Sequence, residues 1–415
     1  MLIIFRILQG ATGGALQPLS QAVMLEAFPP QDRGKAMGFW GLGIVVAPML
    51  GPVLGGWLTD NFSWRWVFYI NVPVGILCIV MVKAFIFDPP YIRKARVGID
   101  YWGISMLTVG IAALQVVLDK GQQEDWFASH LISWLSVIAL GSLAAFVIRE
   151  LRATNPVVQL RVFKTRTYAT GVVLMTVVGF VLYGSMVLLP LFLQSLLGYP
   201  ALEAGIAMAP RGLGSFIAMP VVGLMLSRFD PRKLLALGMI GASYTLYDLS
   251  TLNLHAGYWD VFWPQFFQGL SLALLFVPLT TTTMDPIPKQ ETGNATSLFN
   301  LMRNLGGSMG IATATTLLAR QQQIGSNRLA AHTNEFNPQF SSMLEGLRPG
   351  MMARGADFAT ATKQAYAAIY GMVQRQAAML SFVHVFQLFA IIFIAALPLL
   401  LLMNRPKRTQ AIAAH

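Results

Sequence analysis

Runs of about 20 apolar residues recur along the whole sequence, and this pattern limits the possible folds more than any other feature. A helix of about 20 residues crosses a hydrocarbon layer of about 30 Å, whereas a barrel strand needs only about 10 residues. Only 11% of the residues are charged, against about 25% in a soluble domain. The sequence therefore predicts an all-α polytopic membrane protein. We count eleven transmembrane helices, at 2–26, 37–59, 66–87, 101–118, 130–149, 168–196, 201–227, 233–252, 260–284, 295–318 and 378–403.

The positions of Lys and Arg predict how these helices are oriented. If every helix crosses the membrane, 18 of the 29 Lys and Arg lie on one side, in loops or in the tail after residue 403. Cytoplasmic loops carry an excess of these residues. We therefore expect a cytoplasmic C-terminus, and the net charge of +11 reflects topology rather than a nucleic-acid partner.

Two parts of the sequence match each other at a shift of 259 residues. The matches fall on residue types that chance rarely aligns: Gln9-Gly10 with Gln268-Gly269, Pro29 with Pro288, Gln31 with Gln290, Gly34 with Gly293 and Gly51 with Gly310. Three predicted helices precede the second copy and have no counterpart before the first, so we expect a chain truncated at its N-terminus by about three spans. Duplicated six-helix halves with a substrate site between them are a known transporter plan.

The repeat divides the chain into four parts. We expect residues 1–99 to be the remaining three helices of an N-terminal half and residues 100–150 to be two linker helices. Residues 151–403 would form a complete six-helix half with an extracytoplasmic loop at 319–377, and residues 404–415 a cytoplasmic tail. Within that loop, a surface helix is predicted from an apolar stripe at Ala365, Ile369, Met372 and Ala377.

Four charged residues lie inside predicted helices and are candidates for coupling transport to protons: Arg6, Asp248, Arg211 and Arg303. A charge at bilayer depth costs several kcal/mol unless it is paired or faces water, so such residues are functional candidates. Arg6 shares a helical face with Gly10, Gly13, Gln17 and Gln21, and that face should point away from lipid. The alternatives are a structural arginine bonded to carbonyl groups, and an Asp248 that reaches the outer surface or pairs with an arginine.

The second predicted helix is rich in glycine and proline. Small residues allow helices to approach closely and prolines bend the axis, which predicts a tight, kinked seam. The candidate seam residues are Gly38, Gly41, Gly43, Pro48, Gly51, Pro52, Gly55 and Gly56.

Substrate recognition should use aromatic, apolar and a few polar residues that line a cavity. The candidates are Gln9, Gln17, Tyr183, Met186, Gln265, Phe266, Gln268 and Asn300. The 21 methionines suit an adaptable lining.

Three stretches resemble motifs of the major facilitator superfamily, in its fourteen-span drug/proton antiporter branch of the EmrB/QacA type. RILQGATGGALQP resembles the motif of the fourth span, and GLGIVVAPMLGPVLGGW resembles the antiporter motif of the fifth. WRWVFYINVPVG at 64–75 is similar to a signature of this branch in particular. The resemblance covers the chain from the fourth span onward.

This resemblance implies a multidrug efflux antiporter of the bacterial inner membrane. It would export drugs or toxic amphiphiles by alternating access, driven by the proton gradient without a cofactor. Arg6 occupies the position implicated in proton transfer, and relatives of this type work with a periplasmic adaptor and an outer-membrane channel.

Other classes of function have less support. The sequence contains no phosphate-binding loop ending in Gly-Lys-Ser/Thr, which disfavours an ATP-driven pump. The five histidines are scattered and the single cysteine is Cys78, so neither a metal site nor a membrane enzyme is expected. A proton-coupled symporter and an inactive or mis-started fragment remain as alternatives.

Overall fold

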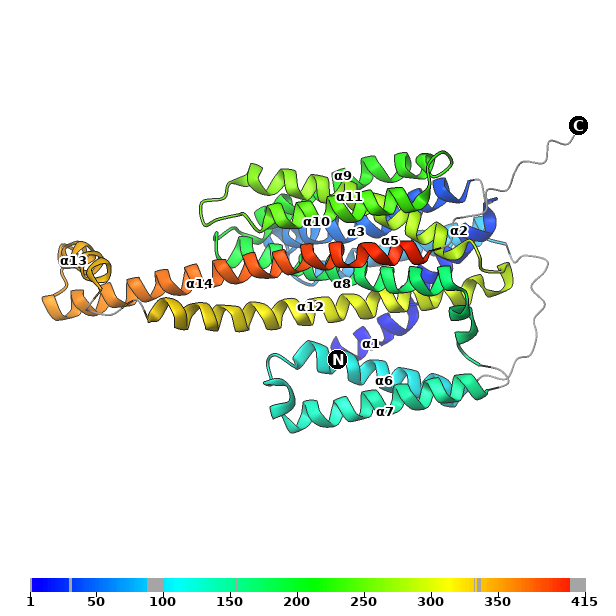
Figure 1. Ribbon diagram of the computed structural model, residues 1–415, viewed down its shortest axis with the longest axis horizontal. Coiled ribbons are helices and arrows are strands. Elements are labelled where there is room, and N and C mark those ends of the chain that lie inside the picture. The colour runs from blue at the N-terminus through cyan, green and yellow to red at the C-terminus, as the bar shows by residue number, and fades with distance from the viewer. Residues whose placement is uncertain are drawn as a thin grey trace, which may run out of the picture.

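The computed structural model describes residues 2–29, 32–87, 100–153, 156–331, 333 and 337–403. Within these ranges every regular element is a helix (Figure 1), which confirms the predicted all-α fold. The α-helices are α1 Leu2–Gly13, α2 Leu16–Ala27, α3 Arg33–Asn61, α4 Trp66–Tyr69, α5 Asn71–Phe85, α6 Tyr101–Lys120, α7 His130–Arg152, α8 Arg166–Ser195, α9 Ala201–Met225, α10 Pro231–Leu249, α11 Tyr258–Met284, α12 Thr292–Ala330, α13 Pro338–Met352 and α14 Phe358–Ala396. Short 3₁₀ helices are η1 Trp126–Ala128, η2 Leu160–Lys164, η3 Lys289–Glu291 and η4 Leu397–Leu402.

Each predicted membrane span coincides with one helix or with two consecutive helices. Among the described residues, seven helical segments are long and apolar enough to cross a membrane: α4 with α5, α6, α7, α8, α9, α11, and α14 with η4. The other four predicted spans correspond to α1 with α2, α3, α10 and α12, which run alongside them in Figure 1. α12 is less apolar partly because it carries Asn300 and Arg303, both of which are buried by neighbouring helices.

The first predicted span, 2–26, is two helices rather than one. α1 ends at Gly13 and α2 begins at Leu16. Glycine has a high entropic cost in a helix, and the ring of Pro18 disfavours a helical carbonyl four residues earlier, at Gly14. The break at Gly13 and Gly14 therefore has a local cause.

The helices from α8 to α14, here called the second bundle, contain most of the buried apolar core. α8 packs along α12 at a very short distance, because a Cβ atom added at Gly306 or Gly310 would collide with main-chain oxygens of Thr176 and Phe180. Small residues permit this approach in a membrane, where close packing rather than hydrophobic burial holds helices together.

The helices from α1 to α5, here called the first bundle, contact the second bundle mainly through α3 and α9. A Cβ atom added at Gly34 would lie 2.9 Å from the main-chain oxygen of Gly223, and one at Gly38 would lie 2.8 Å from that of Met219. We call these four residues the glycine seam. The predicted close approach along this helix exists, and it lies near the start of α3.

The region predicted as a loop at 319–377 is largely helical. α12 continues to Ala330, and the predicted surface helix is the first part of α14, which runs without interruption into the last span. Figure 1 shows these two helices extending past the bundle, with α13 at the tip. Phe340 and Leu344 of α13 pack with Ala365 and Ile369 of α14 in a separate small core. We call this projection the arm. Hydropathy alone could not show it, because a helix can continue beyond the apolar layer.

The predicted apolar stripe of this surface helix is largely buried. Ala365, Ile369 and Ala377 are buried, whereas Met372 is exposed. Three of the four stripe residues therefore hold the arm together.

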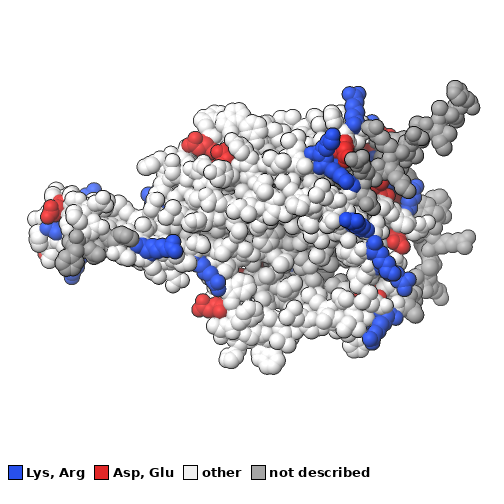
Figure 2. Space-filling view, viewed as in Figure 1, with Lys and Arg blue, Asp and Glu red and all other residues white. Residues whose placement is uncertain are grey.

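Charged side chains are unevenly distributed over the surface. Figure 2 shows Lys and Arg gathered at the end of the bundle opposite the arm. The first turn of α3 and the last turn of α7 contribute Arg33, Arg149 and Arg152. The molecule thus has one basic end and one end that carries the arm.

Candidate functional site

The two copies of the sequence repeat contact each other reciprocally. α2 packs against α12, and α3 packs against α11. The shift of 259 residues aligns α2 with the second part of α11 and α3 with α12. Each helix of the first copy therefore packs against the repeat counterpart of its neighbour. This reciprocal packing indicates pseudo-two-fold symmetry, as expected for a duplicated transporter half.

Polar side chains meet where α2 contacts α12. Asn300 Nδ2 donates to Gln21 Oε1 at 2.6 Å, and Arg303 Nη2 donates to Gln17 Oε1 at 2.7 Å. Gln21, Asn300 and Arg303 are each at most 3% exposed. We call these four residues the polar cluster. Of its members, Gln17, Asn300 and Arg303 are predicted site residues, and the structure brings them together.

Aromatic side chains form one wall of the cluster. The rings of Trp40 and Phe276 stack with centroids 5.9 Å apart, and the guanidinium carbon of Arg303 also lies 5.9 Å from the Phe276 centroid. Phe276 occupies the position in the second copy that Gln17 occupies in the first. Sequence reasoning missed both aromatic residues, although the repeat shift could have indicated Phe276.

Tyr183 of α8 lies beside the turn of α12 that follows Arg303. Its ring lies against Gly307, where any side chain would overlap it. Gly307 therefore leaves the space that Tyr183, a predicted cavity residue, occupies near the polar cluster.

Several buried polar atoms at this level have no hydrogen-bond partner. They are Gln21 Nε2, Arg303 Nε and Nη1, Asn300 Oδ1, and the hydroxyl groups of Thr280 and Thr283. An unpaired buried polar group costs about 1–3 kcal/mol, so such groups mark places where water or a ligand supplies the missing partner. Three of these atoms are N–H donors, and two of the three belong to a cation.

Arg303 has no carboxylate partner within the part of the chain that the structure describes. The ion pairs found there are Lys35 with Asp32 and Arg149 with Asp100, both outside the polar cluster. No group of three His, Cys, Asp or Glu that could hold a metal ion occurs among the described residues. The cluster can therefore bind a polar or anionic group through donors, with an aromatic wall beside it.

A second pair of buried polar side chains lies nearer the start of α11, before Phe276. Gln265 Nε2 donates to Gln268 Oε1 at 3.2 Å, and both residues are at most 2% exposed. The repeat-related pair in α1 is Arg6 and Gln9, where Arg6 Nη1 donates to Gln9 Oε1 at 3.0 Å. The same side-chain bond is thus present in both copies, which supports the duplication.

Arg6 itself is exposed on α1. Its guanidinium carbon lies 4.8 Å from the Phe68 ring centroid. Among the described residues α1 packs only lightly, against α2, so most of its surface is open. Its role in proton coupling stays a prediction.

Arg211 is 2% exposed on α9. Its main-chain oxygen lies against Gly269, and Ser215 Oγ donates to the oxygen of the same glycine at 3.0 Å. The candidate Phe266, whose main-chain oxygen lies against Gly214, is half-buried, and so is the candidate Met186 of α8. Arg211 therefore lies at the contact of α9 with α11, near the Gln265 pair.

Asp248 is not well inside its helix. It is the residue before the last in α10 and is half-buried. The helix ends at Leu249, three residues before the predicted end of the span at 252, so the carboxylate lies in the last turn.

Of the candidate glycines of α3, Gly38 belongs to the glycine seam and Gly41 lies against the Met219 side chain, whereas the glycines further along the helix make no close contact. Gly43, Gly51 and Gly55 have nothing within 4 Å of an added Cβ atom, and Gly56 makes an ordinary contact with Leu202. The side chains of Pro48 and Pro52 lie outside the described residues. The close contact belongs to the glycine seam because α9 approaches α3 most closely near its start.

These features define a class of protein: an all-α membrane transporter built from a duplicated unit, with a polar site between the copies. Comparison with known proteins agrees. The model of the Major Facilitator Superfamily matches residues 1–311, and this chain belongs to that family.

Three curated relatives refine the comparison. The multidrug export protein EmrB of Haemophilus influenzae is 40% identical over 339 residues, covering 81% of this chain and 66% of that protein. EmrB of Escherichia coli is 37% identical over 351 residues, covering 84% and 68%. The fatty acid resistance protein FarB of Neisseria gonorrhoeae is 37% identical over 337 residues, covering 81% and 66%. The chain spans about two thirds of the length of these relatives.

Proposed function

We propose that this chain belongs to a proton-coupled efflux antiporter, which exports amphipathic or lipophilic compounds by alternating access. The relatives named as multidrug export proteins support this proposal at the level of family. The observation that carries it is the polar cluster, in which Arg303 and Asn300 of the second bundle bond to Gln17 and Gln21 of the first. Because residues of both bundles form this site, its geometry changes whenever the bundles rock against each other.

The chemistry of the cluster favours compounds that carry a hydrogen-bond acceptor. The unpaired donors on Arg303 and Gln21 would bind a carboxylate or carbonyl group, and the stacked rings of Trp40 and Phe276 would bind an apolar body. FarB is named for resistance to fatty acids, which combine these two features.

The two ends of the molecule support a proposed location and proposed partners. We place the basic end and the C-terminus in the cytoplasm of a bacterium, with the chain in the inner membrane, because basic residues favour that side. The arm then extends into the periplasm. An adaptor and an outer-membrane channel would dock there, since the arm projects past the apolar bundle.

Transport in everted membrane vesicles tests this function. With a proton gradient imposed, vesicles should accumulate dodecanoate, and an uncoupler should abolish accumulation. Arg303→Gln should lower the apparent affinity for dodecanoate by about 10- to 100-fold, the worth of a charge-assisted hydrogen bond of about 1.5–3 kcal/mol. Lys233→Gln, at an exposed position in the first turn of α10, is the matched control and should have no effect. Gradient-driven transport in the opposite direction would indicate a symporter and overturn the proposal.

A further inference from the structure

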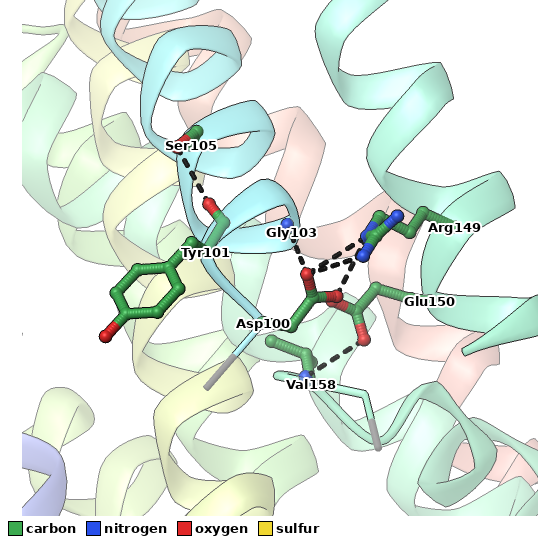
Figure 3. Close-up of polar contacts among 7 residues, drawn as sticks. All are labelled: Asp100, Tyr101, Gly103, Ser105, Arg149, Glu150 and Val158. Carbon is green, nitrogen blue, oxygen red and sulfur yellow. Dashed lines mark hydrogen bonds and ion pairs between the residues drawn. The ribbon is translucent and has the colours of Figure 1, made fainter. Parts of the chain in front are cut away.

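The linker pair, α6 and α7, is fixed at its basic end by an ion pair. Arg149 of α7 donates to Asp100 through Nε at 2.9 Å and through Nη2 at 2.8 Å (Figure 3). The same carboxylate caps α6, because it accepts the N–H of Gly103 at 3.1 Å. Side-chain exposures of 8% for Asp100 and 40% for Arg149 place this pair partly out of solvent. A forked, two-bond contact with a helix cap fixes the angle between the two helices.

The next residue, Glu150, ties α7 to the chain segment that follows it. Glu150 is 5% exposed, and its Oε2 accepts the N–H of Val158 at 3.2 Å (Figure 3). A Cβ atom added at Gly103 would lie 2.9 Å from Glu150 Oε1 and 2.9 Å from Asp100 Oδ2. Gly103 therefore gives both carboxylates room at the start of α6.

The same segment is tied to α12 one residue later. Gln159 N–H donates to Asn294 Oδ1 at 3.0 Å, and Asn294 Nδ2 donates back to the Gln159 oxygen at 3.2 Å. Only main-chain atoms of Gln159 take part. Tyr168 of α8, which is fully buried, donates to the oxygen of Ala295 at 2.9 Å. The first turn of α12 thus holds both the segment after α7 and the start of α8.

Nothing comparable joins the linker pair to the first bundle within the described residues. α6 packs against α7 and α12, whereas no substantial packing joins α6 or α7 to the helices from α1 to α5. The repeat counterpart of Asn294 is Lys35, which pairs with Asp32 of its own turn. Among the described residues, the linker pair is therefore connected to the second bundle and not to the first.

We propose that the linker pair is fastened to the second bundle and moves with it as one body, and that Asn294 is the positioning residue that fastens it. The fastening residues, here called the linker clamp, are Asp100, Arg149, Glu150, Val158, Gln159 and Asn294. The inference rests on the proposed function, since it concerns how the bundles move during transport. α12 carries Arg303, so the clamp also fixes the helix that presents the polar cluster.

Disulfide cross-linking separates motion within one body from motion between bodies. In a Cys78→Ser background, which removes the single cysteine, one variant carries Gln159→Cys with Asn294→Cys and another carries Gly56→Cys with Leu202→Cys. The second pair joins α3 to α9, where an added Cβ at Gly56 lies 3.6 Å from the Leu202 Cα. Each reduced form is the reference for its own oxidised form.

Oxidation of the Gln159/Asn294 variant should leave efflux within about twofold of the reduced form, because the disulfide replaces a bond inside one body. Oxidation of the Gly56/Leu202 variant should reduce efflux at least tenfold, and dithiothreitol should restore it. An equal loss in both variants would overturn the inference. Absence of efflux by the uncross-linked parent would instead count against the proposed function.

Hydrogen exchange tests the clamp independently of transport. The amide protons of Val158 and Gln159 should be protected in the parent chain, and Asn294→Leu should speed exchange of Gln159 at least tenfold. Gln159→Ala keeps the main-chain bonds and should leave the rate unchanged, and Asn294→Asp, which keeps the acceptor, should retain part of the protection. Free exchange of Gln159 in the parent chain would contradict the inference.

Discussion

Arg303 of α12 and Gln17 of α2 are 286 residues apart in sequence and share a hydrogen bond of 2.7 Å between the two bundles. Arg303 is 1% exposed, and its Nε and Nη1 atoms have no hydrogen-bond partner. The guanidinium group is therefore held in place by the first bundle but not neutralised by it.

A carboxylate introduced at position 17 should compete with the substrate for the Arg303 guanidinium group. Gln17→Glu would place a negative charge beside Arg303, and we expect dodecanoate affinity to fall about 10-fold or more, since a charged hydrogen bond is worth about 1.5–3 kcal/mol. The melting temperature in detergent should not fall. Gln123→Glu, at an exposed position between α6 and η1, is the matched control. Unchanged binding in Gln17→Glu would remove Arg303 from the substrate site.

The bond between Asn300 and Gln21 should couple the two bundles energetically. A double-mutant cycle of Asn300→Ala and Gln21→Ala isolates the pair, and a neutral hydrogen bond contributes about 0.5–1.5 kcal/mol. Chemical unfolding in detergent provides the free energies. Additive losses, with no coupling between the two substitutions, would show that the 2.6 Å contact contributes nothing.

Two glycines of α3 should respond differently to the same substitution. Gly38→Ala places a methyl group 2.8 Å from the Met219 main-chain oxygen, so α3 and α9 must separate. Overpacking of this kind costs about 1–3 kcal/mol. Gly51→Ala meets nothing within 4 Å and should be neutral or slightly stabilising, because alanine favours helix. Thermal unfolding of both variants decides the matter, and a larger loss in Gly51→Ala than in Gly38→Ala would contradict the seam as described.

The linker clamp should weaken in acid. The hydrogen bonds from Arg149, and then the N–H of Gly103, hold the pKa of Asp100 below its ordinary value of 3.8. The unfolded chain takes up this proton first as pH falls, so the stabilisation is complete above about pH 5 and is lost as pH falls through the lower, folded pKa. Asp100→Asn should reduce stability at pH 7 and flatten this acid dependence. An identical pH profile in the parent and in Asp100→Asn would show that the ion pair is not linked to folding.

The sequence predicted the membrane helices well, because their apolar runs have the length that a bilayer requires. It also identified Gln17, Asn300 and Arg303 as candidates, since polar residues inside apolar helices are costly and need a reason. It could not pair them, because the partners lie on different bundles and only packing brings them together. The repeat shift of 259 residues also indicates Phe276 as a site residue, because it relates Gln17 to Phe276 and both lie in the same site.

Other features depend on tertiary contacts that composition does not encode. The predicted seam ran from Gly38 to Gly56, whereas α9 approaches α3 most closely at Gly34 and Gly38, at the start of that range. Asp248 looked internal because the apolar run continues past it to Leu252, whereas the helix ends at Leu249. Hydropathy does not predict the arm, because the arm is stabilised by helix pairing outside the apolar layer.

Protection of a single cysteine by substrate tests the central claim most directly. In a Cys78→Ser background, Gln17→Cys should react with N-ethylmaleimide, and saturating dodecanoate should slow that reaction several-fold, because the substrate occupies the space beside Arg303. Gln123→Cys, at an exposed position between α6 and η1, should react at the same rate with and without dodecanoate. Equal rates at position 17, or protection at position 123 alone, would contradict a substrate site between the two bundles.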